Sequence, residues 1–306
     1  MRQNLEEIFL RLIRLYTFNT PIRKGKYRLY QTALSFCKMN HEALPVRMSD
    51  GRRFLANVSD GMQETVYFLG EYERVLTGIT RRIIRQGDVC LDIGANFGWY
   101  TSLMALSCGE SGQVHAFEPV PVSFAELVKT YQAIGSPSNV FLNNIALGDR
   151  RGTVSLHLFD DLKSGHASIA PKVDMHSAVF ECKMIQLDDY LREKGIAEVD
   201  FVKVDIEGAE LMFLQGGERL FSQGSPPIFM IEMALATSKG FGYLPNYLIE
   251  FLRNHCDFRF YAADEHRGTL RLIDGFADDD IGANVFCVPR PRSDEIRSVI
   301  SEYLEK

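Results

Sequence analysis

The stretch Asp92-Ile93-Gly94-Ala95-Asn96-Phe97-Gly98-Trp99-Tyr100 decides the fold class of this 306-residue chain. It continues the apolar run Val89–Ile93 and leads into Tyr100–Ser107, which has helical character. A glycine-rich turn between a strand and a helix is the place where doubly wound α/β folds bind nucleotides. Glycines at 94 and 98 let the backbone turn tightly and approach a ligand without an intervening Cβ. The stretch therefore predicts a ligand site built on an α/β sheet.

The alternation of apolar runs and helical segments continues on the C-terminal side of this turn. Such a pattern favours a mostly parallel sheet that is covered by helices on both faces. Two β-prone runs, Thr153–Phe159 and Phe180–Ile185, are expected as strands inserted between the third and the fourth strand. The five expected parallel strands are Val89–Ile93, Val114–Phe117, Val140–Leu142, Val199–Val204 and Ile228–Ile231, with helices at Tyr100–Ser107, Val122–Ile134 and Glu210–Phe221.

Charge is distributed unevenly along the chain. The net charge of −6 gives no support to a nucleic-acid partner, because proteins that bind phosphate backbones are usually basic. Residues 1–40 hold eight Lys or Arg against two Glu, which is +6, so the remaining residues hold −12. Leu5–Phe18 also has apolar residues at helical spacing. It is interpreted as a helix packed on the main domain or in a homo-oligomer, or as a helix contacting a membrane surface or an acidic partner.

The expected compartment is the cytoplasm. No segment approaches the ~20 apolar residues that a transmembrane helix needs. Ile8–Tyr16 is interrupted by Arg11 and Arg14, which makes a poor signal peptide. The six cysteines are scattered without a C-x-x-C pair, which is typical of a reducing compartment.

Two features of the turn favour S-adenosylmethionine over a dinucleotide. Asn96 occupies the place of the middle glycine that a pyrophosphate requires, and S-adenosylmethionine carries no phosphate. Asp92 would repel phosphates, whereas it can hold the ammonium group of a methionine. Glu118 comes 24 residues after Gly94, near the ~20 at which an acid meets ribose hydroxyls. Because Glu118 suits both cofactors, an NAD-dependent oxidoreductase stays open as an alternative.

Three carboxylates are expected at the carboxyl edge of the sheet. Asp205 and Glu207 follow the fourth strand, and Glu232 follows the fifth. Carboxylates that converge repel one another unless they have cationic or proton-donating partners. A sulfonium cofactor and a substrate that loses a proton would both use them.

These segments together resemble the FkbM family of methyltransferases. The resemblance implies a seven-stranded Rossmann-like sheet and O-methylation of hydroxyl groups on polyketides, sugars and other secondary metabolites. Two departures are Trp99, where Tyr is more usual, and the lack of a histidine after Glu232. The matching segments are Gly70–Glu73, Gly87-Asp88, Asp92–Tyr100, Phe117–Pro119, Ala146–Asp149, Gly165–Ser168, Leu187–Tyr190 and Val204–Glu210, with Glu232.

The resemblance also implies roles for individual residues. It places Asp205 and Glu207 between cofactor and acceptor. On chemical grounds an alcohol must lose its proton, so Asp205 or Glu207 is the expected general base, with His166 as an outside candidate. Glu207 and Glu232 are expected to contact a hydroxylated small-molecule acceptor. Asn144 and Ala146 would border the adenine. No His and Asp stand at metal-ligand spacing, so no metal is expected. The cofactor contacts expected from the turn and from the resemblance are Glu73, Asp92, Gly94, Ala95, Asn96, Gly98, Trp99, Tyr100, Glu118, Pro119, Asn144, Ala146 and Asp205.

The expected organisation has three parts. Residues 1–68 form a helical segment and a β-rich lead-in, 69–292 form the S-adenosylmethionine-dependent methyltransferase domain, and 293–306 form a C-terminal helix. A binding module that keeps the fold without catalysis is a further alternative.

Overall fold

The protein was analysed as a computed structural model, which describes residues 2–22, 24–37, 43–159, 167–168, 177–277 and 280–305. Its centre is an eight-stranded sheet with the order β13-β12-β14-β11-β10-β3-β4-β5. Five neighbouring strands are parallel, as predicted, and β14, β12 and β13 add an antiparallel end. The strands are β3 (Val89–Ile93), β4 (Gln113–Phe117), β5 (Val140–Asn143), β10 (Phe201–Val204), β11 (Ile228–Ala234), β12 (Phe258–Asp264), β13 (Thr269–Ile273) and β14 (Gly282–Pro289).

The sheet contains the seven strands of the expected methyltransferase fold and one more. The eighth strand, β13, forms a hairpin with β12 at the outer edge. The chain reverses its direction of travel across the sheet at β3, because β4 pairs on one side of β3 and β10 on the other. Ligands in open α/β sheets bind at such a switch point.

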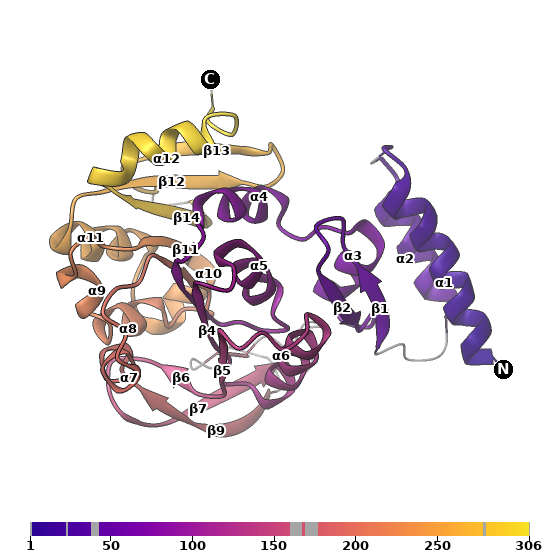
Figure 1. Cartoon of the computed structure of the whole chain (residues 1–306), viewed down its shortest axis with the longest axis horizontal. Coiled ribbons are helices and arrows are strands. Elements are labelled where there is room, and N and C mark those ends of the chain that lie inside the picture. Colours follow the sequence, from indigo (N-terminus) through magenta and orange to yellow (C-terminus); the bar gives the residue numbers. More distant parts are fainter. Residues whose placement is uncertain are drawn as a thin grey trace.

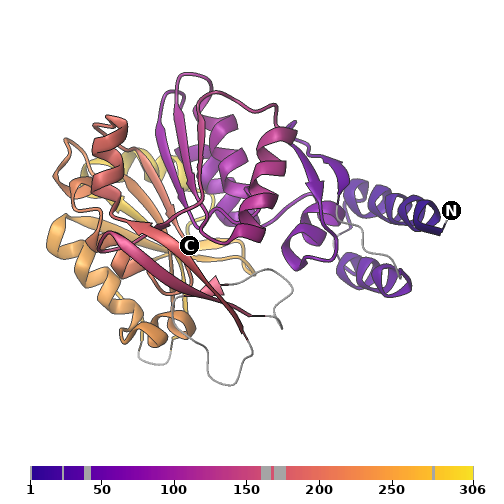
Figure 2. The ribbon, with the colours of Figure 1, turned by 90° about the horizontal axis from the view of Figure 1, so that it is seen from below.

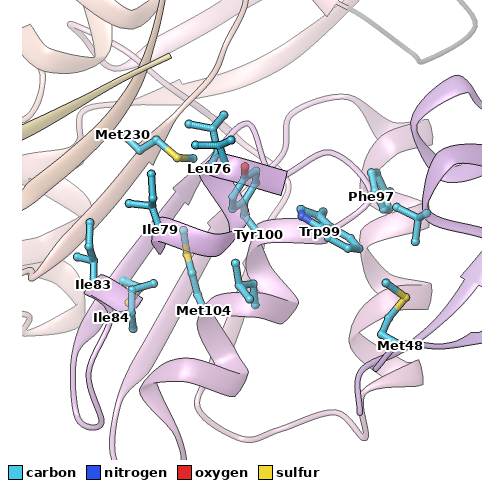
Figure 3. Close-up of a cluster of buried hydrophobic side chains, with 14 of the residues drawn as sticks. Met48, Leu76, Ile79, Ile83, Ile84, Phe97, Trp99, Tyr100, Met104 and Met230 are labelled. Atoms are coloured by element: carbon cyan, nitrogen blue, oxygen red, sulfur yellow. The ribbon is translucent and has the colours of Figure 1, made fainter. Parts of the chain in front are cut away.

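Helices cover both faces of the central sheet (Figure 1). α4 (Arg74–Ile83), α5 (Trp99–Cys108) and α12 (Ser293–Ile300) lie on one face. β11 sends Met230 into that layer, where α4 and α5 meet it, as Figure 3 shows. Its neighbours Phe229 and Ile231 point to the opposite face of the sheet. That face is covered by α7 (Leu187–Lys194), α8 (Glu210–Gln215), α9 (Arg219–Ser222) and α11 (Pro245–His255). A strand buried on both faces is a near-continuous apolar run.

The single helix predicted over 210–221 is wrong. The structure divides it into α8 and α9 at Gly216-Gly217. A Cβ on Gly216 would overlap the carbonyl oxygen of Gly148, so the chain must pass this point without a side chain.

The two inserted β-prone runs belong to a second sheet. Its order is β6-β9-β7-β8, and β7 pairs with β9 in antiparallel register. The strands are β6 (Ala146–Leu147), β7 (Gly152–Phe159), β8 (Ala167–Ser168) and β9 (Ser177–Ile185), and α6 (Pro121–Ala133) connects β4 to β5.

The segment before the central sheet extends to one end of the molecule (Figures 1 and 2). α3 begins at Asp60, whose side chain accepts backbone hydrogen bonds from Met62 and Gln63. The segment joins the α/β body partly through Phe54, which stacks on Trp99 with 5.5 Å between ring centroids. Its elements are α1 (Arg2–Asn19), α2 (Lys26–Phe36), β1 (Leu44–Arg47), β2 (Arg53–Ala56) and α3 (Gly61–Leu69).

Candidate active site

A cavity of about 190 Å³ lies at the carboxyl ends of β3, β4, β10 and β11. Of the residues expected from the sequence, Asp92, Gly98 and Asn144 do not line it, and His166 lies outside the described residues. The expected residues that do line it are Glu73, Gly94, Ala95, Asn96, Trp99, Tyr100, Glu118, Pro119, Ala146, Asp205, Glu207 and Glu232.

The glycine turn is fixed to both neighbouring strands. The backbone N–H groups of Gly94 and Ala95 both donate to the carbonyl oxygen of Phe117, at 3.0 and 2.9 Å. Gly94 has φ 78°, and a Cβ there would overlap the carbonyl oxygen of Asp205. Asn96 has φ 48°, which asparagine tolerates better than most residues. The turn is thus set by close backbone approach, as its glycine predicts.

Glu118 closes the turn from the end of β4. Its carboxylate accepts the backbone N–H of Asn96 at 2.8 Å and that of Val120 at 2.9 Å. Burial raises the pKa of Glu118 to about 7, against the lowering effect of these two hydrogen bonds. Asn144 supports the same loop, because its side-chain amide donates to the Glu118 carbonyl oxygen at 2.7 Å.

Asp92 lies behind the cavity wall and is fully buried. Thr101 donates a hydrogen bond to its Oδ2 at 2.6 Å, and the Lys203 ammonium lies 3.8 Å from its Oδ1. Burial raises the pKa of Asp92, while Lys203 acts in the opposite direction. The cation beside this carboxylate is therefore a side chain of the protein, and its expected contact with a cofactor ammonium stays a prediction.

Among the cavity residues that the sequence did not predict, Lys203 carries the charge. Its ammonium is buried on the cavity wall, donates to the Gly94 carbonyl oxygen at 2.8 Å and lies 3.4 Å from Asp205 Oδ2. Burial lowers the pKa of Lys203, but the charges of Asp205, Asp92 and Glu73 outweigh that effect and leave the pKa above its usual value. The available signal was a lysine within the fully buried strand β10, since buried lysines are rare unless paired.

Besides Glu118, four carboxylates line the cavity: Asp205, Glu207, Glu232 and Glu73. The first three meet at one edge, as predicted, and Glu73 joins them from the residue before α4. Burial, followed by the charge of Asp205, raises the pKa of Glu232 to about 9 and that of Glu73 to about 7. The Tyr100 hydroxyl donates to Glu73 at 2.6 Å, and one oxygen of Glu232 is buried without a hydrogen-bond partner.

A further acid, Glu210, holds the loop that carries Asp205 and Glu207. Its Oε1 accepts the backbone N–H groups of Ile206 and Gly208, each at 3.1 Å. Burial raises the pKa of Glu210 to about 7. Tyr243 donates to the Gly208 carbonyl oxygen at 2.8 Å and lies 3.0 Å from Glu210 Oε2. The loop is therefore held by side-chain hydrogen bonds on its protein side.

Gly98 and Trp99 make packing and hydrogen-bond contacts with other parts of the protein. Gly98 has φ 90° and packs against Leu127 and Thr130 of α6. The Trp99 indole donates to Thr77 at 2.9 Å, and the Arg52 guanidinium lies 4.2 Å from the centre of its ring system.

Within the described part of the chain, no three His, Cys, Asp or Glu side chains are grouped as metal ligands. None of the helices described is long and apolar enough to cross a membrane.

Comparison with known proteins gives consistent matches. The model of the methyltransferase FkbM domain matches residues 92–260. The 31-O-demethyl-FK506 methyltransferase FkbM of Streptomyces tacrolimicus is 30% identical over 162 residues, which cover 44% of this chain and 61% of the relative. The hexuronic acid methyltransferase AglP of Haloferax volcanii is 28% identical over 131 residues, covering 43% of this chain and 50% of the relative.

The chain thus spans about half to three fifths of the length of these curated relatives. A crystal structure of methyltransferase FkbM from Methylobacillus flagellatus aligns with a TM-score of 0.41 at 12% identity, covering 93% of this chain and 58% of that one. The family model covers more than half of the present chain. This chain therefore belongs to the FkbM family of methyltransferases, whose methyl donor is S-adenosylmethionine.

Proposed function

We propose that this methyltransferase O-methylates a hydroxyl group of a small-molecule acceptor, such as a sugar, a lipid, a polyketide or another secondary metabolite. The names of two relatives support this proposal, since one refers to a 31-O-demethyl compound and the other to a hexuronic acid. Family membership sets aside the oxidoreductase that the sequence left open. Turnover by the purified protein separates the methyltransferase from a binding module on the same fold.

S-adenosylmethionine fits the residues of the cavity. The turn residues Gly94 and Ala95 line the cavity and bring it close to the backbone, and the buried Glu118 carboxylate, also on the cavity wall, is suited to ribose hydroxyls. Pro119 and Ala146 offer apolar surface for the adenine. When bound, S-adenosylmethionine supplies a methyl group on a positively charged sulfur atom.

The backbone at Glu207 is the observation that carries the proposal. Glu207 has φ 55°, a left-handed conformation that is uncommon for a residue with a side chain. Such conformations persist where the surroundings enforce them, and they cluster at functional sites. Here Glu210 and Tyr243 enforce the loop, and the Glu207 side chain lines the cavity.

Glu207 is the proposed general base. With the donor bound, its S–CH₃ bond would break as the O–CH₃ bond forms, which releases S-adenosylhomocysteine, and the proton of the acceptor hydroxyl would pass to the Glu207 carboxylate. Base assistance of this kind contributes about 10²–10⁴-fold to a rate, and alignment of the reacting atoms supplies up to ~7–11 kcal/mol. Asp205 and Glu232 border the same space and are proposed to bind the acceptor hydroxyls.

The test is Glu207→Gln, which keeps the shape of the side chain and removes its basicity. An acceptor is first found by screening hydroxylated sugars, lipids and polyketides for S-adenosylhomocysteine release. Turnover is then expected to fall about 10²-fold or more, with cofactor affinity within a few-fold of wild type. The matched control is Glu250→Gln, an exposed glutamate of α11. Wild-type turnover of Glu207→Gln would remove Glu207 as the base and make His166 the next residue to replace.

A further inference from the structure

One face of α1 anchors this helix to the protein. Leu10 is fully buried, and the Thr17 hydroxyl donates to the carbonyl oxygen of Phe68 in α3 at 2.6 Å. Phe18 packs so closely on Gly70 that a Cβ at position 70 would overlap its ring. These contacts fix which side of α1 faces the protein.

The other side of α1 is a continuous apolar surface that faces solvent. Its six large side chains are between 39% and 62% exposed. At 3.6 residues per turn they fall within an arc of about 120°. The charged residues of α1 after Gln3, which are Glu6, Glu7, Arg11 and Arg14, all lie outside that arc. We name this surface the apolar stripe: Leu5, Ile8, Phe9, Leu12, Leu15 and Tyr16.

Exposed apolar and basic residues continue beyond α1. Ile22, Tyr27 and Phe36 are 62%, 61% and 71% exposed, and Lys24 and Arg28 are exposed as well. Residues 1–40 carry a net +6 while the rest of the chain carries −12. Figures 1 and 2 place α1 and α2 at one end of the molecule, so the charge difference runs along its length.

We propose that the apolar stripe docks on the surface of an anionic phospholipid bilayer. Helices that lie in the bilayer interface combine one apolar face with basic residues beside it. An anionic leaflet attracts each nearby Lys or Arg by about 1 kcal/mol. The same leaflet repels the acidic body, which orients the molecule with α1 and α2 toward the lipid.

Charge favours the bilayer over a second copy of the chain as the occupant of the stripe. Two copies joined stripe to stripe would bring two segments of +6 together, and like charges at an interface disfavour that arrangement. An anionic bilayer instead complements both the apolar and the basic character of this end of the molecule.

The docked surface is connected to the active-site cavity through α3. This helix contacts α1 through Phe68, and it contributes Met62 to the cavity wall. Docking would therefore hold the cavity at a fixed position relative to the lipid.

The test is co-sedimentation of the full chain with vesicles of phosphatidylcholine, with and without phosphatidylglycerol. Binding is expected only with phosphatidylglycerol, and high salt should weaken it. The double variant Ile8→Glu/Leu12→Glu should lower the partition coefficient at least about tenfold. The matched control is Val122→Glu/Leu272→Glu, which adds the same charge at equally exposed apolar positions of α6 and β13 and should bind like wild type. S-adenosylhomocysteine binding by all variants verifies the fold.

Two outcomes would overturn the proposal. Wild-type protein that stays in the supernatant with both vesicle types shows that the stripe does not bind lipid. Equal loss of binding in the stripe variant and the control shows that added negative charge alone is responsible. If light scattering shows a wild-type dimer that Ile8→Glu/Leu12→Glu dissociates, with no lipid binding, the stripe is an interface between copies.

Discussion

Gly94 has no room for a side chain because the carbonyl oxygen of Asp205 occupies the place that a Cβ would take. Gly94, which opens the glycine turn, and Asp205, which follows β10, are thus in close backbone contact. Lys203 adds to this contact, because its ammonium donates to the Gly94 carbonyl oxygen at 2.8 Å. A change in the glycine turn is therefore expected to move the loop that carries Asp205 and Glu207, and the reverse.

Gly94→Ala should abolish tight cofactor binding, with an affinity loss of about 100-fold or more (about 2.7 kcal/mol), because the new methyl group must displace the Asp205 backbone. Gly135→Ala is the matched control, since Gly135 has φ 95° but no atom within 4 Å of the added Cβ. The control should cost only the left-handed backbone penalty of about 1–2 kcal/mol in stability and leave affinity unchanged. Calorimetric titration with S-adenosylhomocysteine measures the affinity of both variants. Equal affinities of the two variants would show that the contact between Gly94 and the Asp205 backbone does not shape the site.

Lys203→Met should destabilise the fold by about 3–5 kcal/mol, because it leaves the fully buried Asp92 without its cation. Adding Asp92→Asn to this variant should restore part of the loss, since no uncompensated charge then remains. Urea unfolding measures the free energies. Lys129→Met, which removes a more exposed ion pair with Glu126, should cost less than about 1 kcal/mol. No recovery in the double variant would assign the effect to Asp205 instead.

Glu118→Ala should weaken cofactor binding at least about tenfold, as expected for the loss of a charged hydrogen-bond partner worth ~1.5–3 kcal/mol. It should also lower stability by about 1–3 kcal/mol, because the buried backbone N–H groups of Asn96 and Val120 lose their acceptor. Calorimetry and thermal unfolding separate the two effects, with Glu250→Ala as the exposed control. Unchanged affinity together with lower stability would mean that Glu118 only holds the turn.

Glu232 should make stability depend on pH between pH 7 and 9. Its pKa in the folded protein is raised to about 9, so its contribution to stability is complete below its ordinary pKa and is lost as pH rises toward 9. Glu73, Glu118 and Glu210 behave likewise, but their pKa values near 7 place their losses at lower pH.

The expected result is a melting temperature that falls between pH 7 and 9 in wild type and falls less in Glu232→Gln. The slope difference has an upper bound of about 1.4 kcal/mol per pH unit. Parallel curves for the two proteins would show that Glu232 is already ionised at pH 7.

The sequence predicted those parts of the fold in which local pattern and tertiary environment agree. Val89–Ile93 is β3 to the residue, because a strand buried on both faces is apolar at nearly every position, with Asp92 as the exception here. The division of the helix at Gly216 depends on close contact with the distant Gly148 carbonyl oxygen. The periodicity of apolar residues in 210–221 does not reveal that contact. The antiparallel pairing of β12, β13 and β14 likewise depends on partner strands that a linear reading does not identify.

In the candidate site, too, local pattern predicted some residues and tertiary contacts alone reveal others. Residues placed by strand ends, such as Asp205 and Glu232, were found because strand ends meet at one edge. Lys203 was missed because its importance comes from three-dimensional neighbours, namely Asp92 on β3 and Asp205 beside it. Glu73 was included through its motif, whereas its contact with Tyr100 is visible only in the folded chain.

The cavity draws Met62, Tyr72 and Glu73 from residues that precede the matched stretch 92–260. The part of the chain that defines the family thus supplies the donor turn and the acidic wall, while an upstream part supplies one side of the pocket. Exchange of the upstream part between relatives would replace that side of the pocket, Glu73 included, and is expected to alter which acceptors fit. For enzyme engineers, residues 1–88, which end before β3, are therefore a natural unit for building chimeras with new acceptor ranges.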